Sequence, residues 1–507
     1  MIDAAVSAFN SLFACPCVFG FMPGTLFYLF VGVLTGLALG AIPGLGGVVG
    51  MAMLLPFTFD MQPQAALAML IGITAVTTTS DTIPSVLFAV PGTTGSQATI
   101  LDGHPMAKNG EAGRAFGAAY MASLIGGVFG ALVLALSIPV LRPMVLLFGS
   151  PEFFMLGLLG IAMVAVLSGG APLKGLIAGA LGLGVGMIGA DPQSGFPRWA
   201  GDQLYMWNGL PLVAVTLGLF AIPEVLDLAI KGTRIADIPR NATNGVMTGI
   251  RDTFRNWWMV MRCSALGVWV GFIPGLGASV VDWFAYGYAL QTQKGARETF
   301  GKGDVRGVIA PESANNAKEG GSLIPTIAFG VPGSAPMALL LAAFTIHGLK
   351  PGPDMLTKNL DLTYTMIWSL ALANVLGTAI CLAFTFQLAK VASIRIHMLT
   401  PLVLSFVFLA AYQSSSNIGD LITLLVFGVL GWFMKRCGWP RPPLLLGLVL
   451  SSVIETYLFI SLRLYGMGWM ARPFVIGIAV LIVFSLYFGL RRNKVPMPVQ
   501  PAEGKAS

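Results

Sequence analysis

The sequence Gly40-Ala-Ile-Pro-Gly-Leu-Gly46 returns almost unchanged as Gly271-Phe-Ile-Pro-Gly-Leu-Gly277, 231 residues further along the chain (271 − 40). Each copy interrupts an apolar run that is long enough to form a helix. Neither proline-glycine pair fits inside a regular helix, because proline removes a backbone donor and glycine loosens the backbone dihedral angles. A membrane protein tolerates such a break where the freed backbone groups find partners in protein or in a polar cavity. The two breaks therefore indicate a binding site.

Apolar residues make up 56% of the 507-residue chain, and charged residues only 10%. A soluble domain could not cover this much apolar surface, so the composition predicts an integral membrane protein. Apolar runs of roughly 17 to 25 residues recur along the chain, which is the length of a bilayer-spanning helix. The long alternating segments of a membrane barrel are absent from the sequence. We expect an all-α integral membrane protein of about 10–12 transmembrane helices.

The net charge of +7 comes mainly from Lys and Arg in short loops and at the C-terminus, so we expect no nucleic-acid partner. The five cysteines are scattered and suit small core residues, and Cys15-Pro-Cys17 is too short a cluster to indicate a metal site or a disulfide. The start of the chain lacks a basic segment, and no cleaved signal peptide is expected. No nucleophile triad, carboxylate pair or phosphate-binding motif stands out, so the chain is not expected to be an enzyme.

A second motif is also repeated. Ile83-Pro-Ser-Val-Leu-Phe-Ala-Val-Pro-Gly92 matches Ile324-Pro-Thr-Ile-Ala-Phe-Gly-Val-Pro-Gly333 at six of ten positions, at an offset of 241 (324 − 83). One repeated Pro-Gly motif could arise by chance, but two motifs in the same order indicate an internal duplication.

The duplication divides the chain into five parts: an interfacial segment (1–22), a first transmembrane repeat (23–230), a basic cytoplasmic linker (231–256), a second transmembrane repeat with a C-terminal helix (257–490) and a cytoplasmic tail (491–507). We expect a polar loop at 102–114. Apolar runs predict helices at 25–41, 48–59, 65–81, 115–147, 152–169, 173–190, 209–230, 257–272, 280–290, 362–390, 399–413, 418–435, 442–462 and 473–490.

Loop charges bear on how the two repeats are oriented. The turn at 60–63 has no Lys or Arg, whereas its counterpart at 291–306 has four, and opposite sides of the membrane would account for the difference. The next pair of loops, 102–114 and 347–358, carries two basic residues each and leaves the question open. The first pair favours inverted repeats with broken or re-entrant helices, the architecture of many secondary transporters.

A half-helix that starts after a Pro-Gly break presents unpaired N–H groups and a partial positive charge, which suit a carboxylate, while freed carbonyl groups suit sodium. The alternative is that Pro and Gly only kink the helices and allow close packing; a repeated seven-residue motif argues against it. The residues expected to bind substrate are Pro43, Gly44, Leu45, Gly46, Gly47, Pro91, Gly92, Thr93, Pro274, Gly275, Gly277, Ala278, Ser279, Asn315, Asn316, Pro332, Gly333 and Ser334.

Acidic residues inside apolar segments are the second set of candidates. Asp81 precedes a break and is either a sodium or proton ligand or a plain helix cap; a sodium site would use Thr79, Ser80, Asp81 and Ser96. Asp282 and Glu312 lie near the motifs in the sequence, and either of them could equally lie at the membrane–water interface. Glu224 and Glu455 have a structural role or pair with a basic residue such as Arg463. The three histidines show no metal-binding spacing.

Taken together, seven segments resemble the large membrane subunit of tripartite tricarboxylate transporters, and the resemblance runs from about residue 24 to about residue 465. They are Gly40 to Gly47, Ile83 to Gly92, Asp102 to Arg114, Asp191 to Gly195, Gly218 to Val225, Gly307 to Asn316 and Val331 to Ser334.

The resemblance implies a multi-pass permease of the bacterial inner membrane that works with a small membrane subunit and a periplasmic solute-binding protein. It implies import of a carboxylate such as citrate with the sodium or proton gradient, and no other cofactor. The chain departs from the family near its C-terminal end, where relatives have a Glu followed by an Asn-Leu-Arg-Arg type run. Here Glu455 is followed by Thr-Tyr-Leu-Phe-Ile460, and Arg463 is the candidate to replace the missing basic pair.

The main hypothesis is a secondary active transporter in which the broken segments meet around a carboxylate that a moving bundle carries across the membrane, in the manner of an elevator. A passive anion or cation channel through the same segments is the alternative. A membrane scaffold without transport is a third reading, and it should tolerate substitution in the Pro-Gly motifs. A homodimer is left open.

Overall fold

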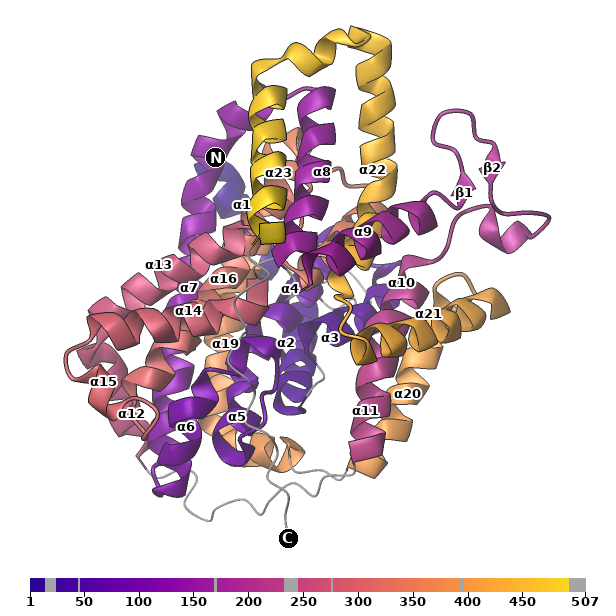
Figure 1. Cartoon of the computed structure of the whole chain (residues 1–507). Coiled ribbons are helices and arrows are strands. Elements are labelled where there is room, and N and C mark those ends of the chain that lie inside the picture. Colours follow the sequence, from indigo (N-terminus) through magenta and orange to yellow (C-terminus); the bar gives the residue numbers. More distant parts are fainter. Residues whose placement is uncertain are drawn as a thin grey trace.

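The computed structural model describes residues 1–13, 24–43, 46–167, 171–231, 245–274, 277–392 and 396–491 (Figure 1). In the first half its elements are α1 (Ile2–Phe13), α2 (Thr25–Ala41), α3 (Gly47–Leu54), η1 (Leu55–Thr58), α4 (Pro63–Ser80), α5 (Thr82–Phe88), η2 (Thr94–Ser96), α6 (Thr99–Lys108), α7 (Ala112–Leu146), α8 (Ser150–Leu167), α9 (Pro172–Gly186), β1 (Gly189–Ala190), β2 (Pro197–Arg198), η3 (Leu204–Met206), α10 (Leu212–Thr216), η4 (Leu217–Ala221) and α11 (Ile222–Lys231).

The remaining elements are α12 (Val246–Arg255), α13 (Trp257–Phe272), α14 (Gly277–Thr292), α15 (Ala296–Thr299), α16 (Arg306–Phe329), α17 (Ala335–Ile346), α18 (Pro353–Leu356), α19 (Leu360–Ala392), α20 (Ile396–Gln413), α21 (Ile418–Arg436), α22 (Pro442–Tyr465), η5 (Gly468–Ala471) and α23 (Pro473–Arg491). Within the described residues five helical stretches are long and apolar enough to cross a membrane: Pro63–Phe88, Ala112–Leu146, Leu360–Lys390, Ile418–Arg436 and Pro442–Tyr465. The all-α membrane fold predicted from composition is confirmed.

Helix bounds follow the sequence prediction closely where apolar runs end at Pro or Gly. Helices α2 and α13 begin and end at the predicted residues. In both helices the residue that follows, Ile42 or Ile273, donates its N–H back to a carbonyl three residues earlier, at 3.2 Å in each case. The two breaks of the repeated motif therefore begin with the same backbone geometry.

The prediction of a polar loop at 102–114 is wrong, because α6 covers Thr99–Lys108. Asp102, on this helix, is fully buried and accepts hydrogen bonds from the Tyr286 hydroxyl (2.8 Å) and from three N–H groups at 301–304 (2.9 Å each). These partners lie far away in the sequence, so the local polarity of the segment gave no indication of a helix.

The three basic segments that contain α6, α12 and α15 lie on the same side of the molecule, where the three helices are seen together in Figure 1. Asp102 of α6 binds residues 301–304, and Arg114 at the start of α7 bonds Asp252 of α12 at 2.7 Å. In the loop between α15 and α16, burial raises the pKa of Asp304. Hydrogen bonds from Arg306 and Thr299 lower it more, so that pKa lies below its ordinary value. The adjacency is the arrangement that the positive-inside rule predicts for cytoplasmic segments.

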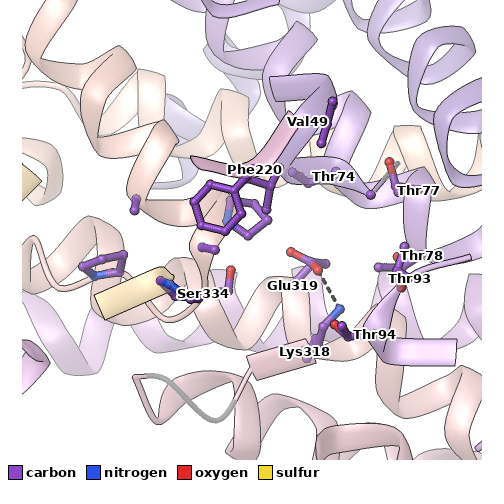
Figure 2. A pocket seen from close by; sticks show the side chains of 18 of the residues that line it. Val49, Thr74, Thr77, Thr78, Thr93, Thr94, Phe220, Lys318, Glu319 and Ser334 are labelled. Carbon is purple, nitrogen blue, oxygen red and sulfur yellow. Dashed lines mark hydrogen bonds and ion pairs between the residues drawn. The ribbon is translucent and has the colours of Figure 1, made fainter. Parts of the chain in front are cut away.

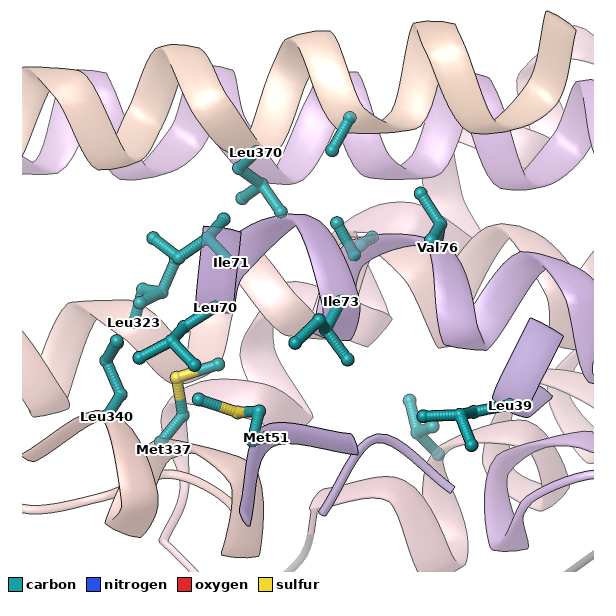
Figure 3. Close-up of a cluster of buried hydrophobic side chains, with 14 of the residues drawn as sticks. Leu39, Met51, Leu70, Ile71, Ile73, Val76, Leu323, Met337, Leu340 and Leu370 are labelled. Atoms are coloured by element: carbon teal, nitrogen blue, oxygen red, sulfur yellow. The ribbon is translucent and has the colours of Figure 1, made fainter. Parts of the chain in front are cut away.

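Helix α4 lies at the centre of the main apolar cluster, and its spanning window is completely buried. Leu70 and Ile71 of α4 pack among Met51 of α3, Leu323 of α16 and Leu370 of α19 (Figure 3). Because α4 faces protein on all sides, its polar end, Thr77-Thr-Thr-Ser-Asp81, is removed from lipid.

A second apolar cluster is formed by α8, α9, α21, α22 and α23, with Val215 of α10, Leu219 and Phe220 of η4, Ala338 of α17 and Trp469 of η5. Helices α8, α22 and α23 stand together in the upper part of Figure 1. The described residues thus form two apolar clusters, and the contact between them matters for the site.

Glycine permits close helix contacts at equivalent places in the two halves. A Cβ on Gly36 of α2 would lie 2.5 Å from the Ile73 carbonyl oxygen of α4, and Gly267 of α13 faces Ala314 of α16 in the same way. Gly40 and Gly271 repeat the correspondence one turn later, against Thr77 and Lys318. Such small-residue contacts drive helix association in membranes. The repeat seen in the sequence therefore extends to packing.

The two decapeptides also end alike. Ala89 and Gly330, at equivalent positions, both adopt the left-handed conformation, with φ of 55° and 67°. The following residues, Val90 and Val331, donate their N–H groups to the carbonyls of Pro84 and Pro325 at 3.4 and 3.2 Å. Ala89 occupies a conformation that favours glycine. A non-glycine residue there indicates that the surrounding packing imposes the turn.

We predict that the two repeats have opposite orientations, which side-specific labelling can test. Gln62 and Lys302 are both exposed in turns that the duplication relates to each other. Cysteines at 62 and 302, in a background without the five native cysteines, should react with a membrane-impermeant maleimide from opposite sides in oriented vesicles. Labelling of both positions from one side would contradict the inverted arrangement.

Candidate functional site

A cavity of about 480 Å³ lies where the two apolar clusters meet (Figure 2). Three of the four interrupted segments line it, and the second copy of the seven-residue motif does not contribute a described lining residue. From the predicted substrate site the cavity collects Gly46, Gly47, Pro91, Gly92, Thr93, Pro332, Gly333 and Ser334. The sequence therefore identified most of one wall.

Two helices start at this wall. Helix α3 begins at Gly47 and α17 at Ala335, and neither start has a side-chain cap. The first N–H groups of a helix have no partner within the helix, and they carry a partial positive charge. Because Gly46, Gly47, Ser334 and Ala335 all line the cavity, the N–H groups at the start of α3 and that of Ala335 in α17 are candidates to bind an anion there, whereas Pro336 of α17 has no N–H.

Lys318 and Glu319 of α16 form a buried ion pair in the cavity wall, with 2.7 Å between Nζ and Oε1. Their side chains are 1% and 5% exposed. Lys318 also donates to the backbone oxygen of Asn315 (3.0 Å) and to its Oδ1 (2.9 Å), so all three ammonium protons are used. Glu319 Oε2 has no hydrogen-bond partner among the described residues.

The opposite wall combines Phe220 of the second apolar cluster with the charged side chains of Glu224 and Arg441. Arg441, in the turn before α22, binds Glu224 of α11 at 2.9 Å, donates to the Leu219 carbonyl at 3.1 Å and stacks over Phe220 at 5.2 Å. Lys435 binds the other oxygen of Glu224 at 2.8 Å. Leu219 and Phe220 lie in η4, a π-helical turn, and such turns are frequent at functional sites.

Arg463 does not pair with either glutamate, so that suggested pairing is wrong. Glu455 instead receives two hydrogen bonds from Arg198, at 2.6 and 2.9 Å, and Arg463 donates to Gln193. The Glu455 carboxylate raises the pKa of Arg198, and a backbone N–H from Gln193 lowers the pKa of Asp191 in the same hairpin. These contacts attach the β1–β2 hairpin to α22, which is a structural role for Glu455.

Asp81 lies at the junction of α4 and α5 and is fully buried. One carboxylate oxygen, Oδ2, accepts hydrogen bonds from the Thr93 hydroxyl and from the Asn315 amide (3.5 Å), whereas Oδ1 has no partner among the described residues. Because Thr93 caps the start of η2 and Asn315 is on α16, this carboxylate joins the two halves of the chain next to the cavity.

The other residues of the predicted sodium site point elsewhere. Thr79 accepts a hydrogen bond from Asn316 at 2.8 Å, and Ser80 donates toward the carbonyls of Val76 (3.4 Å) and Gly36 (3.5 Å). Ser96 lies closer to Asp81, because its hydroxyl contacts Ser85 (3.0 Å) and Ser85 donates to the Asp81 carbonyl. Within the described residues no group of three or more His, Cys, Asp and Glu side chains could hold a metal.

Several predicted residues cannot be placed. Gly44, Leu45 and Gly275 lie outside the described residues, as do the side chains of Ala278 and Ser279, whose backbone forms the first turn of α14 together with Gly277. Pro43 and Pro274 stand two residues after the ends of α2 and α13. Asn315 and Asn316 are fully buried behind the cavity wall, where Asn316 also bonds Asn374 of α19 at 2.9 Å.

Asp282 and Glu312 are not interfacial, because both are fully buried. Asp282 accepts from the N–H of Ala98 at 2.9 Å, and Glu312 accepts from the hydroxyls of Thr99 (2.7 Å) and Ser123 (3.2 Å). Each carboxylate of the second half thus holds the start of α6 in the first half. They connect the repeats and do not line the cavity.

The sequence prediction missed Lys318, Glu319 and Arg441 as site residues. The available signal was a Lys-Glu pair inside a segment that carries no other charged residue between Asn316 and Phe329. An ionisable residue at membrane depth is by default a functional candidate. Arg441 had no such signal, because it stands in a short loop where a basic residue is ordinary.

A protein-family model described as the tripartite tricarboxylate transporter TctA family matches residues 26–446. The chain is 33% identical over 437 residues, 86% of each chain, to an uncharacterised 52.8 kDa protein of the TAR-I ttuC' 3' region of Agrobacterium vitis. A second uncharacterised protein, from the TAR-II ttuC' 3' region of the same organism, is 34% identical over 192 residues, which cover 38% of this chain and 79% of the relative. No solved structure matches.

We predict that Lys318→Thr alone destabilises the protein more than Lys318→Thr combined with Glu319→Thr. The single change leaves a buried carboxylate without its cation, which costs about 3–5 kcal/mol, whereas the double change removes both charges and copies Thr77 and Thr78 of the first half. Thermal unfolding of purified protein in detergent measures the difference. A double variant as unstable as the single one would contradict an ion pair that matters for stability.

Proposed function

Since this chain belongs to the tripartite tricarboxylate transporter TctA family, we propose that it drives uptake of a carboxylate across the bacterial inner membrane with an ion gradient. Transporters of this family combine the large membrane component with a small membrane subunit and a periplasmic binding protein. The chain is accordingly a multi-pass membrane protein that receives its substrate from the binding protein. Citrate-like tricarboxylates and other organic acids are the substrate class.

The observation that carries this proposal is the cavity with two uncapped helix starts in one wall. Each start offers N–H donors and a positive dipole end to a carboxylate oxygen. The two starts come from different halves of the chain, so one ligand with two carboxylates can contact both. Half-helix N-termini that face an anionic substrate group are the arrangement of other secondary transporters.

An elevator-type movement is the proposed transport step. Met51 of α3 and Met337 of α17, close to the two helix starts, belong to the main apolar cluster, whereas Phe220 and Leu446 of the facing wall belong to the second. We propose that a ligand held by the starts of α3 and α17 travels with these helices while the facing wall stays fixed.

Sodium or protons are the proposed coupling ions, and Asp81 is the proposed ligand. Its free oxygen, the Thr93 hydroxyl and the nearby amide of Asn315 supply oxygen ligands of the kind that sodium takes. Thr93 also lines the cavity, so an ion at Asp81 and a carboxylate at the helix starts would stabilise each other.

We expect Gly92→Ala and Gly333→Ala to abolish uptake, because a Cβ would lie 2.6 Å from the Cα of Asp81 or 2.7 Å from the Cα of Ser322. Gly287→Ala in α14, where a Cβ meets open space, is the matched control and should transport normally. The measurement is uptake of labelled carboxylates into proteoliposomes that contain both membrane subunits and the binding protein. Accumulation against a concentration gradient excludes a channel, and normal uptake by both variants would refute the site.

We expect Asp81→Asn to remove the dependence of uptake on the coupling ion. The amide keeps the shape of the side chain but loses the charge that attracts the cation. Asp282→Asn is the control, because that buried carboxylate already bonds backbone N–H groups of Ala98 and Trp283 at 2.9 Å. Uptake is measured as sodium concentration and pH are varied. An unchanged ion dependence in Asp81→Asn would place the coupling site elsewhere.

A further inference from the structure

We propose that α12 and the start of α13 bind an anionic phospholipid of the cytoplasmic leaflet. The proposal concerns the outer surface of the protein and goes beyond transport through the cavity. Helix α12 packs closely on α7: a Cβ on Gly249 would collide with the Arg114 carbonyl oxygen, and the Thr253 hydroxyl donates to the Ala118 carbonyl at 3.1 Å. The side of α12 that faces away from α7 is exposed, and it has the composition of a lipid-binding surface.

Two strips of side chains run along this exposed side. Met247 and Phe254, which are 60% and 56% exposed, stand two helical turns apart and form an apolar strip. Arg251 and Arg255 are also exposed, stand one turn apart and form a basic strip beside it. A helix divided in this way lies in the membrane interface, with its apolar side chains toward the acyl chains and its basic side chains toward the headgroups.

The apolar surface continues into α13, which begins one residue after α12. Trp257 and Trp258 stand at this start, and each is more than half exposed. Tryptophan side chains collect at the boundary between headgroups and acyl chains. Trp269, three turns further along the same face of α13 as Trp258, is 65% exposed. The junction of α12 and α13 is therefore placed at the headgroups, and the rest of this face of α13 at the acyl chains.

An arginine on this face of α13 calls for an anion. Arg262 stands one turn after Trp258, and its guanidinium lies 5.9 and 5.5 Å from the ring centres of Trp258 and Tyr288. Within the described part of the chain Arg251, Arg255 and Arg262 form no ion pair with a carboxylate. Asp252, the acidic residue of α12, is bound by Arg114. A long basic side chain near the end of a membrane helix reaches back to the interface, where a lipid phosphate is the available anion.

The charge of the segment agrees with an anionic partner. Residues 231–256 hold five basic and two acidic side chains, an excess of three positive charges (5 − 2), and they lie on the basic side of the molecule with α6 and α15. The positive-inside rule assigns that side to the cytoplasm. Basic segments next to membrane helices are attracted to anionic lipids of that leaflet. A phospholipid supplies a phosphate and apolar chains in one molecule, as the two strips require.

The test compares phosphatidylglycerol, which is anionic, with phosphatidylcholine, which has no net charge. Each lipid is titrated into the purified complex of the two membrane subunits in detergent, and bound lipid is counted by native mass spectrometry. Arg251→Gln combined with Arg255→Gln should weaken binding of phosphatidylglycerol by about 30-fold and leave that of phosphatidylcholine unchanged. The expected size follows because each arginine near anionic headgroups contributes about a factor of five.

Two further variants separate a lipid site from simpler explanations. Arg297→Gln combined with Lys302→Gln removes the same charge from exposed positions on the same side, and it should bind phosphatidylglycerol like the wild type. Met247→Ser combined with Phe254→Ser should weaken binding of both lipids, because the acyl chains lose their contact, whereas a site for free phosphate would not change. Because all these side chains are exposed, the melting temperature of each variant without added lipid should match that of the wild type.

Equal affinity of the wild type for the two lipids overturns the proposal. An equal loss in the Arg297 and Lys302 variant shows attraction to a generally positive surface and overturns the site. Unchanged affinity in the Met247 and Phe254 variant overturns it as well, because the apolar strip would then have no part in binding. Loss of the small membrane subunit from the Arg251 and Arg255 variant during purification would assign this surface to that subunit. Each of these results leaves the proposed transport function untouched.

Discussion

A backbone that leaves its helix inside a membrane must find hydrogen-bond partners within the protein, because lipid offers none. The breaks after α2 and α13 meet this constraint by lying against α4 and α16, two helices whose membrane segments are enclosed by protein. Both carry polar residues at the level of the breaks, Thr77 to Asp81 in one and Asn315 to Glu319 in the other. The interrupted segments, the polar residues and the cavity are therefore consequences of one requirement.

Close helix contact is the condition that makes this enclosure complete. Gly126 and Gly130 of α7 lie against the backbone of α16 at Ser313 and Ala317, so no side chain separates the two helices. The same role falls to Gly36 and Gly40 between α2 and α4. Packing of this kind replaces the hydrophobic effect as the driving force between helices in lipid. It also explains why so much glycine is compatible with a helical chain.

The sequence predicted those features that depend on neighbouring residues. Bounds of α2 and α13 follow from apolar runs that end at Pro-Gly, and the Pro91 to Thr93 and Pro332 to Ser334 segments lie at the cavity as expected. Features that depend on distant partners were missed. Helix α6 is held by residues about two hundred positions away, and the Arg198–Glu455 pair spans a similar distance. Arg441 enters the site through its hydrogen bond to the Leu219 carbonyl of η4, more than two hundred positions away in the sequence.

The internal duplication limits what the backbone alone can recognise. Equivalent left-handed turns and equivalent glycine contacts give the described parts of the two halves a similar backbone, and backbone N–H donors read a carboxylate and little else. A ligand with different ends can be oriented only where the copies differ in side chains. The largest such difference near the cavity is Thr77 and Thr78 in α4 against Lys318 and Glu319 in α16, since neutral hydroxyls stand where the other copy has two buried charges. We therefore expect selectivity within the membrane subunit to depend on this asymmetric pair more than on the repeated motifs.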